Sequence, residues 1–180
     1  MIICDEDHRR NVDRAVFPNM QGGPLEHVVA AKAVAFAEAM TPEFAEYQRG
    51  IVANAKAMAD ELQAGGMRLV SGGTENHTVL VDMTPMDLTG RQAEEALGEV
   101  GIVVNRNAIP YDEKPPRVAS GMRLGTPAIT SRGMGESEAR QIGRLIIRSL
   151  SNIGDVSVQS QVKSEVLDLA SHHPVPGIDV

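Results

Sequence analysis

The sequence predicts an α+β domain in which helices pack on a small, largely antiparallel or mixed sheet. Segments with helical periodicity and short apolar runs follow in the order helix, helix, strand, strand, helix, strand, strand, helix, helix. Hydrophobic residues make up 42% and charged residues 23% of the 180 residues, which is near the globular average and excludes general disorder. No apolar run approaches the roughly 20 residues of a membrane-spanning helix.

The first elements are expected to differ in character. Residues 1–23 are expected to be irregular or extended, with residues 17–24 as a loop. Pro24 suits the first turn of a helix, because its missing N–H would have no helical partner there. Residues 28–40 are apolar on nearly every face, and a helix that is hydrophobic all round is buried or lies in an interface.

A second helix is predicted to begin at Thr41, with Thr41 as N-cap and Pro42 as its first residue. Its apolar positions repeat every three or four residues and place one stripe toward a core. This stripe consists of Phe44, Tyr47, Ile51, Ala55, Met58 and Leu62. Gly65 and Gly66 are expected to end the helix.

The rest of the chain alternates short strands with helices. Strands are predicted at residues 67–70, 77–83, 101–105 and 120–124. Thr89 and Gln92 have the spacing of a capping box and open a helix between the second and third strands. Residues 106–119 hold three prolines and are expected to form a loop. A turn of helix follows the fourth strand at Pro127. The last two helices are predicted at residues 136–150 and 158–169.

Charge and metal-binding residues exclude several classes of function. The net charge of −7 argues against a broad nucleic-acid surface. Cys4 is the single cysteine, so it can form no intramolecular disulfide and build no cysteine metal site. The five histidines lack the spacing of a zinc site, and we expect no metal site. The first residues carry no signal-peptide pattern, and we expect a cytoplasmic protein.

Arg123 is the first candidate for chemistry. An arginine flanked by apolar residues on a short strand is costly to bury without a partner. Its planar fork fits a carboxylate through two parallel hydrogen bonds. Two interpretations stay open from the residues alone: a clamp for a substrate carboxylate, or a structural salt bridge with one of the 24 acidic residues.

Two loops are further candidates. Gly22 and Gly23 precede a helix, where glycines let the backbone approach a ligand and the helix N-terminus favours an anion. A tight turn is the alternative. Asn105 and Asn107 lie where a strand runs into the proline-rich loop, and such loops often hold binding residues. A turn formed by the asparagines alone is the alternative there.

Taken together, these motifs resemble those of serine hydroxymethyltransferase, in the family's order and approximate spacing. The motifs that carry the resemblance are residues 15–18, residues 21–24 with His27, residues 31–35, Ser71-Gly72-Gly73-Thr74-Glu75-Asn76-His77, Leu88-Thr89-Gly90, residues 120–130 (Ser-Gly-Met-Arg-Leu-Gly-Thr-Pro-Ala-Ile-Thr) and Arg132-Gly133. They extend over nearly the whole chain.

The resemblance implies a fold-type-I pyridoxal-phosphate enzyme that interconverts serine and glycine and passes a one-carbon unit to tetrahydrofolate. It implies that this chain is the C-terminal part, with residues 1–40 as a remnant of the large cofactor-binding domain and its linking helix, and residues 41–180 as the small domain. A homo-oligomer, such as the family's homodimer, is expected.

The family's Schiff-base lysine belongs to a segment that this chain does not contain. The four lysines, Lys32, Lys56, Lys114 and Lys163, lie in other motifs. We therefore expect no catalytic residue in this chain and no full reaction by the chain alone.

The resemblance also implies roles for individual residues. Arg123 matches the arginine that holds the substrate carboxylate. Gly22 and Gly23 match the pair that reaches the cofactor phosphate, in the family from the neighbouring subunit. Asn107 matches the asparagine that faces the pterin. The folate-contacting segment, which often reads Ser-Pro-Phe in the family, is here Pro115, Pro116 and Arg117. His77 matches a motif residue to which no role is assigned.

Two other interpretations stay open. The chain could be a stand-alone α+β binding or interaction domain that uses the same surface for a carboxylate or phosphate ligand. It could also belong to another fold-type-I pyridoxal-phosphate enzyme, although the loop around Asn107 favours folate. The first alternative differs from the enzyme in one requirement: the enzyme needs an upstream segment that contains the cofactor lysine, and a binding domain does not.

Overall fold

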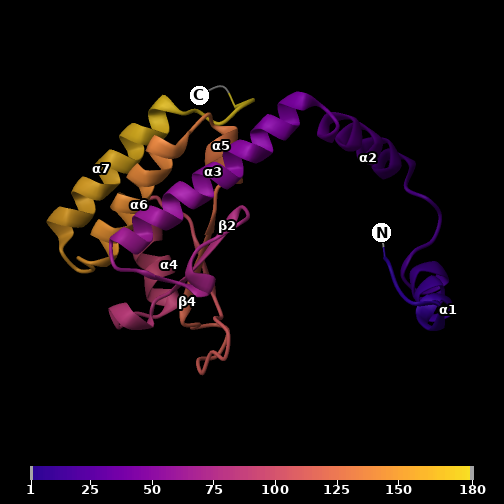
Figure 1. Cartoon of the computed structure of the whole chain (residues 1–180), viewed down its shortest axis with the longest axis horizontal. Coiled ribbons are helices and arrows are strands. Elements are labelled where there is room, and N and C mark those ends of the chain that lie inside the picture. The colour runs from indigo at the N-terminus through magenta and orange to yellow at the C-terminus, as the bar shows by residue number, and fades with distance from the viewer. Residues whose placement is uncertain (1, 179–180) are drawn as a thin grey trace. The chain divides into compact units, whose positions relative to one another are not determined.

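The computed structural model describes residues 2–178, and the chain divides into two units, residues 1–44 and 45–180 (Figure 1). The first unit holds α1 (Glu6–Arg14), a wide helical turn η1 (Ala15–Met20) and α2 (Glu26–Ala39). None of these three elements contains a buried residue.

The expectation of irregular structure over residues 1–23 is wrong, because α1 and η1 occupy most of that segment. Charge rather than apolar periodicity stabilises α1. Glu6 and Asp7 lie in its first turn, where the helix dipole favours acids, and Arg14 lies in its last turn, where the dipole favours a base. Arg9 pairs with Glu6 and Asp13 one turn away on either side.

The helix predicted over residues 28–40 is confirmed as α2, which begins at Glu26. Pro24 precedes the helix and its N-cap Leu25, so its expected place in the first turn is wrong. The loop expected over residues 17–24 is found only from Gln21 onward, because η1 extends to Met20.

The second long helix, α3 (Pro42–Ala64), begins and ends as predicted. The hydroxyl of Thr41 accepts a hydrogen bond from the amide of Phe44 at 3.2 Å, which is the expected N-cap contact. After residue 64 the elements are β1 (Arg68–Leu69), η2 (Val70–Gly72), β2 (Thr78–Asp82), η3 (Thr84–Met86), α4 (Gly90–Glu99), β3 (Asn105–Asn107), β4 (Gly121–Gly125), α5 (Pro127–Ser131), α6 (Glu136–Leu150) and α7 (Val156–His172).

The four strands found within residues 2–178 form one sheet in the order β1-β2-β4-β3, and every neighbouring pair is antiparallel. This confirms the predicted α+β class with a small antiparallel sheet. The third strand was expected at residues 101–105, and that position is wrong. Gly101 adopts a left-handed φ of 87° and the amide of Ile102 bonds to the carbonyl of Leu97, so this segment caps α4 and pairing begins only at Asn105.

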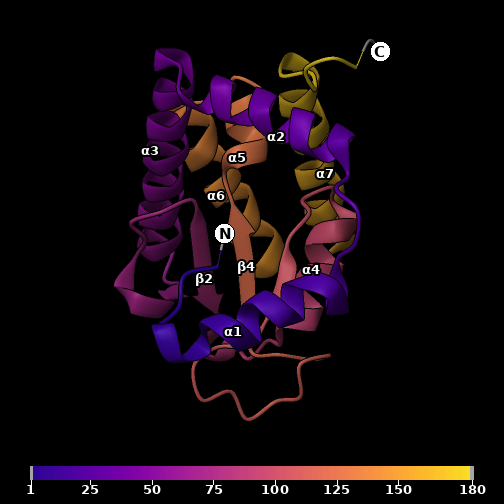
Figure 2. The same cartoon turned by 90° about the vertical axis from the view of Figure 1, so that its right-hand side faces the viewer.

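One face of the sheet packs on the helices and forms the core. Val79, Val81 and Met122 are fully buried on this face. They join apolar side chains from α3, α4, α6 and α7, represented by Leu62, Leu97, Ile146 and Val162. In Figure 2 α6 and α7 lie behind β2 and β4, and among residues 45–178 no helix crosses the front of these two strands.

The C-terminal helix is fastened to this core by polar contacts. Arg132, which follows α5, donates to the carbonyl of Ala170 at 2.8 Å and to that of His173. A cation at a helix C-terminus satisfies carbonyls that have no helical partner. At the other end of α7, Gln159 bonds to Ser149 of α6. The two ends of α7 are therefore held by Arg132 and by α6.

Candidate functional site

Arg123 lies at the centre of β4, on the face of the sheet that the helices leave open. It pairs with Leu80 on β2 and with Asn105 on β3, so these three residues form one row across the sheet. The side chain is exposed, whereas its neighbours Met122 and Leu124 point into the core and are buried. Strand alternation thus places the guanidinium on the open face, and the sequence GMRLG fixes that alternation.

Within residues 2–178 the guanidinium of Arg123 makes no hydrogen bond or ion pair. The buried acid on this sheet, Asp82, is occupied elsewhere. It pairs with Arg68 at 3.2 Å and accepts hydrogen bonds from the amide and hydroxyl of Thr84. The structural salt bridge that was one interpretation of Arg123 is therefore not formed among the described residues, and the fork remains free for a ligand.

A shallow cavity of about 340 Å³ surrounds this arginine. Its polar lining comes from Arg123, Asn105, Thr78 and His77. His77 precedes β2, and its carbonyl accepts a hydrogen bond from the amide of Thr126 at 3.2 Å. The structure thus brings His77, a motif residue without an assigned role, to the same cavity as Arg123.

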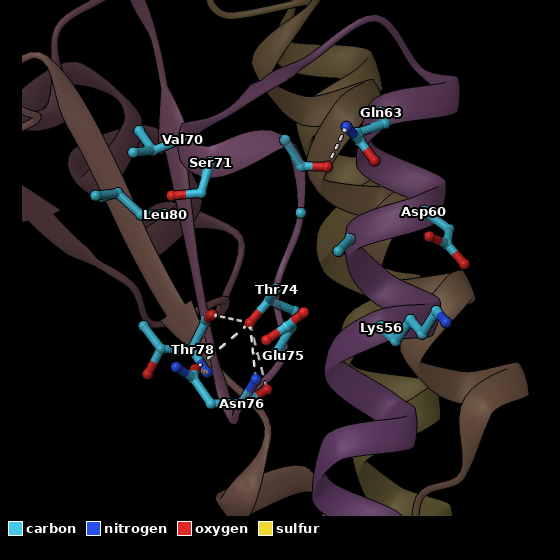
Figure 3. Close-up of a pocket in the computed structure, with 13 residues that line it drawn as sticks. Lys56, Asp60, Gln63, Val70, Ser71, Thr74, Glu75, Asn76, Thr78 and Leu80 are labelled. Carbon is cyan, nitrogen blue, oxygen red and sulfur yellow. Dashed lines mark hydrogen bonds between the residues drawn. The ribbon is translucent and has the colours of Figure 1, made fainter.

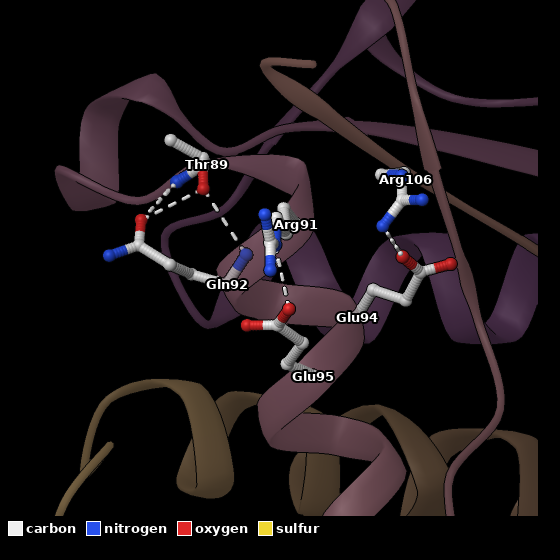
Figure 4. A network of polar contacts seen from close by, with 6 residues as sticks. All are labelled: Thr89, Arg91, Gln92, Glu94, Glu95 and Arg106. Carbon is white, nitrogen blue, oxygen red and sulfur yellow. Dashed lines mark hydrogen bonds and ion pairs between the residues drawn. The ribbon is translucent and has the colours of Figure 1, made fainter. Parts of the chain in front are cut away.

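Asn107 ends β3, opposite Gly121 on β4. Its side-chain amide donates to the carbonyl of Ala108 at 2.7 Å, which leaves the side-chain oxygen without a donor among the described residues. Between the two asparagines, Arg106 points to the helical side and bonds to Glu94 of α4 at 2.8 Å (Figure 4). This ion pair fixes β3 to α4 and leaves Asn105 and Asn107 on the other face.

Figure 4 also shows the start of α4, where the predicted capping box is confirmed. The hydroxyl of Thr89 accepts from the amide of Gln92 at 3.1 Å, and the side chain of Gln92 accepts from the amide of Thr89 at 2.9 Å. Farther along, Arg91 pairs with Glu95 at 2.7 Å, which raises the pKa of the arginine. The helix that supports β3 is thus fixed at its N-terminus.

The predicted folate-contacting residues Pro115, Pro116 and Arg117 are exposed in the loop between β3 and β4. The carboxylate of Asp112 organises this loop. It accepts hydrogen bonds from the amides of Ile109, Lys114 and Ser120 and from the hydroxyl of Ser120, at 2.7–3.2 Å. Desolvation of the carboxylate raises its pKa, but these bonds outweigh it and lower the pKa to about 2.

The role of Asp112 was missed from the sequence. One signal was available: an aspartate whose oxygen accepts from the amide two residues on forms an Asx-turn, and Asp112 does this with Lys114. The bonds to Ile109 and Ser120 depend on the return of the chain into β4, which no local pattern reveals.

Gly22 and Gly23 lie in the first unit, in the exposed loop between η1 and α2. Neither amide has a hydrogen-bond acceptor within residues 2–178, and a Cβ at either glycine would meet no atom within 4 Å. Two free, exposed amides could donate hydrogen bonds to the oxygen of a phosphate that comes from outside the unit. Arg123, Asn107 and the Pro115–Arg117 segment belong to the second unit.

Residues 71–76 of the Ser71–His77 motif line a cavity of about 750 Å³ between α3 and β2 (Figure 3). The hydroxyl of Thr74 donates to the carbonyl of Thr78 at 2.7 Å and accepts from the amide of Asn76, which folds the motif into a tight turn. Across the cavity, Gln63 of α3 donates to the carbonyl of Gly72 at 3.1 Å. Lys56 and Asp60 project from α3 beside it.

No three of the His, Cys, Asp and Glu side chains in the described part of the chain come together as a metal site. Among residues 2–178 no helix has the length and apolar character needed to cross a membrane.

A family model described as serine hydroxymethyltransferase matches residues 3–146. The match covers well over half of the chain, and it includes the strands that carry Arg123 and Asn107 and the loop that carries Gly22 and Gly23. The motifs quoted above lie in the matched segment. The chain belongs to the serine hydroxymethyltransferase family.

Proposed function

We propose that this chain supplies the substrate-carboxylate and folate-contacting parts of an enzyme that interconverts serine and glycine and transfers a one-carbon unit to tetrahydrofolate. Residues 1–40 then belong to the large domain and its linking helix, and residues 41–180 form the small domain. Family membership supports a transferase, and the arrangement of the open sheet face supports the specific reaction.

The observation that carries this proposal is the free guanidinium of Arg123. A planar fork on an open face, with neighbouring amide and hydroxyl groups, suits a carboxylate that arrives from outside the sheet. The role of Arg123 is to orient the amino acid by two parallel hydrogen bonds. Such orientation selects which bond of the substrate lies in position to break.

Pyridoxal phosphate, when bound, supplies the electron sink that the carbon chemistry needs. The residues of this chain that fit it are Gly22 and Gly23, whose two free amides would donate to its phosphate. In the family these glycines reach the cofactor from a neighbouring subunit, so we also propose a homo-oligomer. The single exposed cysteine, Cys4, is consistent with a reducing cytoplasm.

The 180-residue polypeptide by itself is proposed to be inactive, because none of its lysines lies in the family's cofactor-lysine motif. Lys56 is exposed beside the cavity of Figure 3, and Lys114 hydrogen-bonds to Ser120 at 3.4 Å. The test is to mix the chain with pyridoxal phosphate, reduce with borohydride and map adducts by mass spectrometry. Scattered partial labelling is expected. Stoichiometric labelling of one lysine, together with serine cleavage, would contradict the proposal.

The role of Arg123 is tested by Arg123→Lys in the complete enzyme, meaning this chain joined to the family's cofactor-binding domain. Lysine keeps the charge but loses the fork. Loss of a charge-assisted hydrogen bond costs about 1.5–3 kcal/mol, which is roughly a 10- to 150-fold loss of serine affinity. Cofactor affinity should stay the same. Arg91→Lys, which alters an exposed arginine on α4, is the matched control. Unchanged serine affinity in Arg123→Lys would overturn the proposal.

A further inference from the structure

The loop between β3 and β4 is closed at its base by a single carboxylate. Oδ1 of Asp112 accepts from the amide of Lys114 at 2.9 Å and from the hydroxyl of Ser120 at 2.7 Å. Oδ2 accepts from the amide of Ser120 at 2.8 Å and from that of Ile109 at 3.2 Å. A carboxylate offers about four lone-pair sites, so both oxygens are fully used.

These bonds join the two ends of the loop. Ile109 lies two residues after Asn107, and Ser120 directly precedes β4. Ser120 is only 3% exposed, so its amide and hydroxyl depend on protein acceptors. The same junction is packed tightly, because a Cβ on Gly121 would lie 2.7 Å from the carbonyl oxygen of Asn107 and 2.7 Å from a methyl group of Ile109.

The junction determines where the rest of the loop can go. Asn107 is held on one side by pairing with Gly121. On the other side, the amides of Val118 and Ala119 bond to the carbonyl of Pro115 and form a turn. The carbonyls of Val118 and Ala119 then accept from the amides of Arg91 and Gly90 at the start of α4. The position of the exposed segment 115–117 therefore depends on these backbone bonds and on the bonds that Asp112 accepts at the base of the loop.

We propose that Asp112 is a positioning residue for the folate: it fixes the loop so that Asn107 and the Pro115–Arg117 segment face the ligand together. This inference rests on the proposed function, because the contact of Asn107 and the Pro115–Arg117 segment with folate is itself part of that proposal. Asp112 itself touches no ligand, because all of its acceptor sites are used within the loop.

Asparagine is a sharp test of this role. In Asp112→Asn, one of the two oxygens becomes an NH₂ group that faces hydrogen-bond donors, so two of the four bonds are lost. Asp112→Glu keeps both oxygens on a side chain longer by one methylene and should restore part of the effect. Glu113→Gln is the matched control, because Glu113 is an exposed acid in the same loop and makes no hydrogen bond in the described structure.

The first measurement is amide hydrogen exchange by NMR in the full 180-residue chain. In Asp112→Asn, exchange should rise about tenfold or more at the amides that face the new NH₂ group, which are Ile109 and Ser120 at the Oδ2 position or Lys114 at the Oδ1 position. The rise should be smaller in Asp112→Glu and absent in Glu113→Gln. The amides of the buried strand residues Val79 and Val81 should keep their exchange rates, which shows that the domain stays folded. Unchanged exchange at the three loop amides would overturn the proposal.

The second measurement is kinetic and uses the complete enzyme. In Asp112→Asn, KM for tetrahydrofolate should rise about tenfold or more, with the affinity for serine changed less than about twofold. Asp112→Glu should recover part of the tetrahydrofolate KM. An equal rise for both substrates, or no rise for tetrahydrofolate, would overturn the positioning role. Failure of the proposed function is recognised separately, because then Arg123→Lys also leaves serine affinity unchanged.

Discussion

The two units of the chain use apolar residues in opposite ways. In residues 2–44 the side chains of Val29, Val34 and Phe36 on α2 are all more than half exposed. In residues 45–178 the sheet and helices enclose a continuous apolar core, and every buried hydrophobic residue of the described chain lies from Ile51 onward. Apolar content alone therefore does not mark a core.

The difference lies in the pattern. In α6 the buried residues Ala139, Gly143, Ile146 and Leu150 follow at steps of four, three and four, and the helix has one polar and one apolar side. In α2 the apolar residues surround the helix, so one covering surface could not bury them all. The apolar pattern of the second unit therefore matches a core with one covered side per helix, whereas the pattern of α2 provides no single apolar side.

The largest effect is expected from one substitution made in both units. Leu97→Ala removes a side chain with 0% exposure and should lower the free energy of unfolding by about 2–5 kcal/mol. Leu25→Ala removes the same atoms from a residue that is 62% exposed, and should change stability by less than about 0.5 kcal/mol. Urea unfolding followed by circular dichroism measures both. Equal losses would show that residues 2–44 share the core.

A second pair of variants compares the glycines. Gly121→Ala places a methyl group against backbone and should cost about 1–3 kcal/mol of stability. Gly22→Ala adds the same group in open space and should leave stability within about 0.5 kcal/mol. Thermal unfolding of both variants gives the comparison. A stable Gly121→Ala protein would mean that the β3–β4 junction can widen without cost.

The exposed surface of α2 predicts self-association of the chain. Light scattering at micromolar concentration should give a mass above the 19.3 kDa of the monomer. Val34→Glu puts a charge on that surface and should weaken association about tenfold or more, roughly 1.4 kcal/mol. Lys32→Gln changes the net charge by the same amount on the same helix and should have little effect. A monomeric wild-type chain that binds no hydrophobic dye would contradict this prediction.

The smallest expected effect is a loss of folding stability at low pH, which arises from Asp112 in the second unit. Asp112 has its pKa lowered from 3.8 to about 2, so the unfolded chain takes up the proton first as the pH falls. Stability from this group is fully present above about pH 4 and is lost as the pH falls to about 2, by about 1 kcal/mol for a partly exposed carboxylate. Asp112→Asn should remove this part of the pH dependence in acid unfolding curves. Residues 45–180 alone should retain it, and Glu113→Gln should leave it intact.

Local signals in the sequence were sufficient for much of the fold. The N-cap at Thr41, the capping box at Thr89 and the apolar repeat of residues 136–150 each act within one or two turns, and α3, α4 and α6 follow them. The alternation around Arg123 likewise placed that side chain on a strand face. These elements could be predicted because their determinants are close in the sequence.

The remaining features depend on contacts that no short window contains. The helix α1 is stabilised by charge pairs, which carry no apolar period. The strand β3 begins later than predicted, because residues 101–102 cap α4 and do not pair with a neighbouring strand. That Arg123 has no partner follows only from the three-dimensional positions of the acids, and the role of Asp112 follows only from the return of the loop to Ser120.

The attachment of α7 has a consequence for where the polypeptide can be truncated. The family match ends at residue 146, inside α6, whereas Val162 of α7 is fully buried and Arg132 reaches the carbonyls of Ala170 and His173. A protein stopped at the family boundary would end in the middle of a core helix and leave apolar residues of the sheet uncovered. The segment that keeps this core intact is therefore longer than the segment that matches the family model.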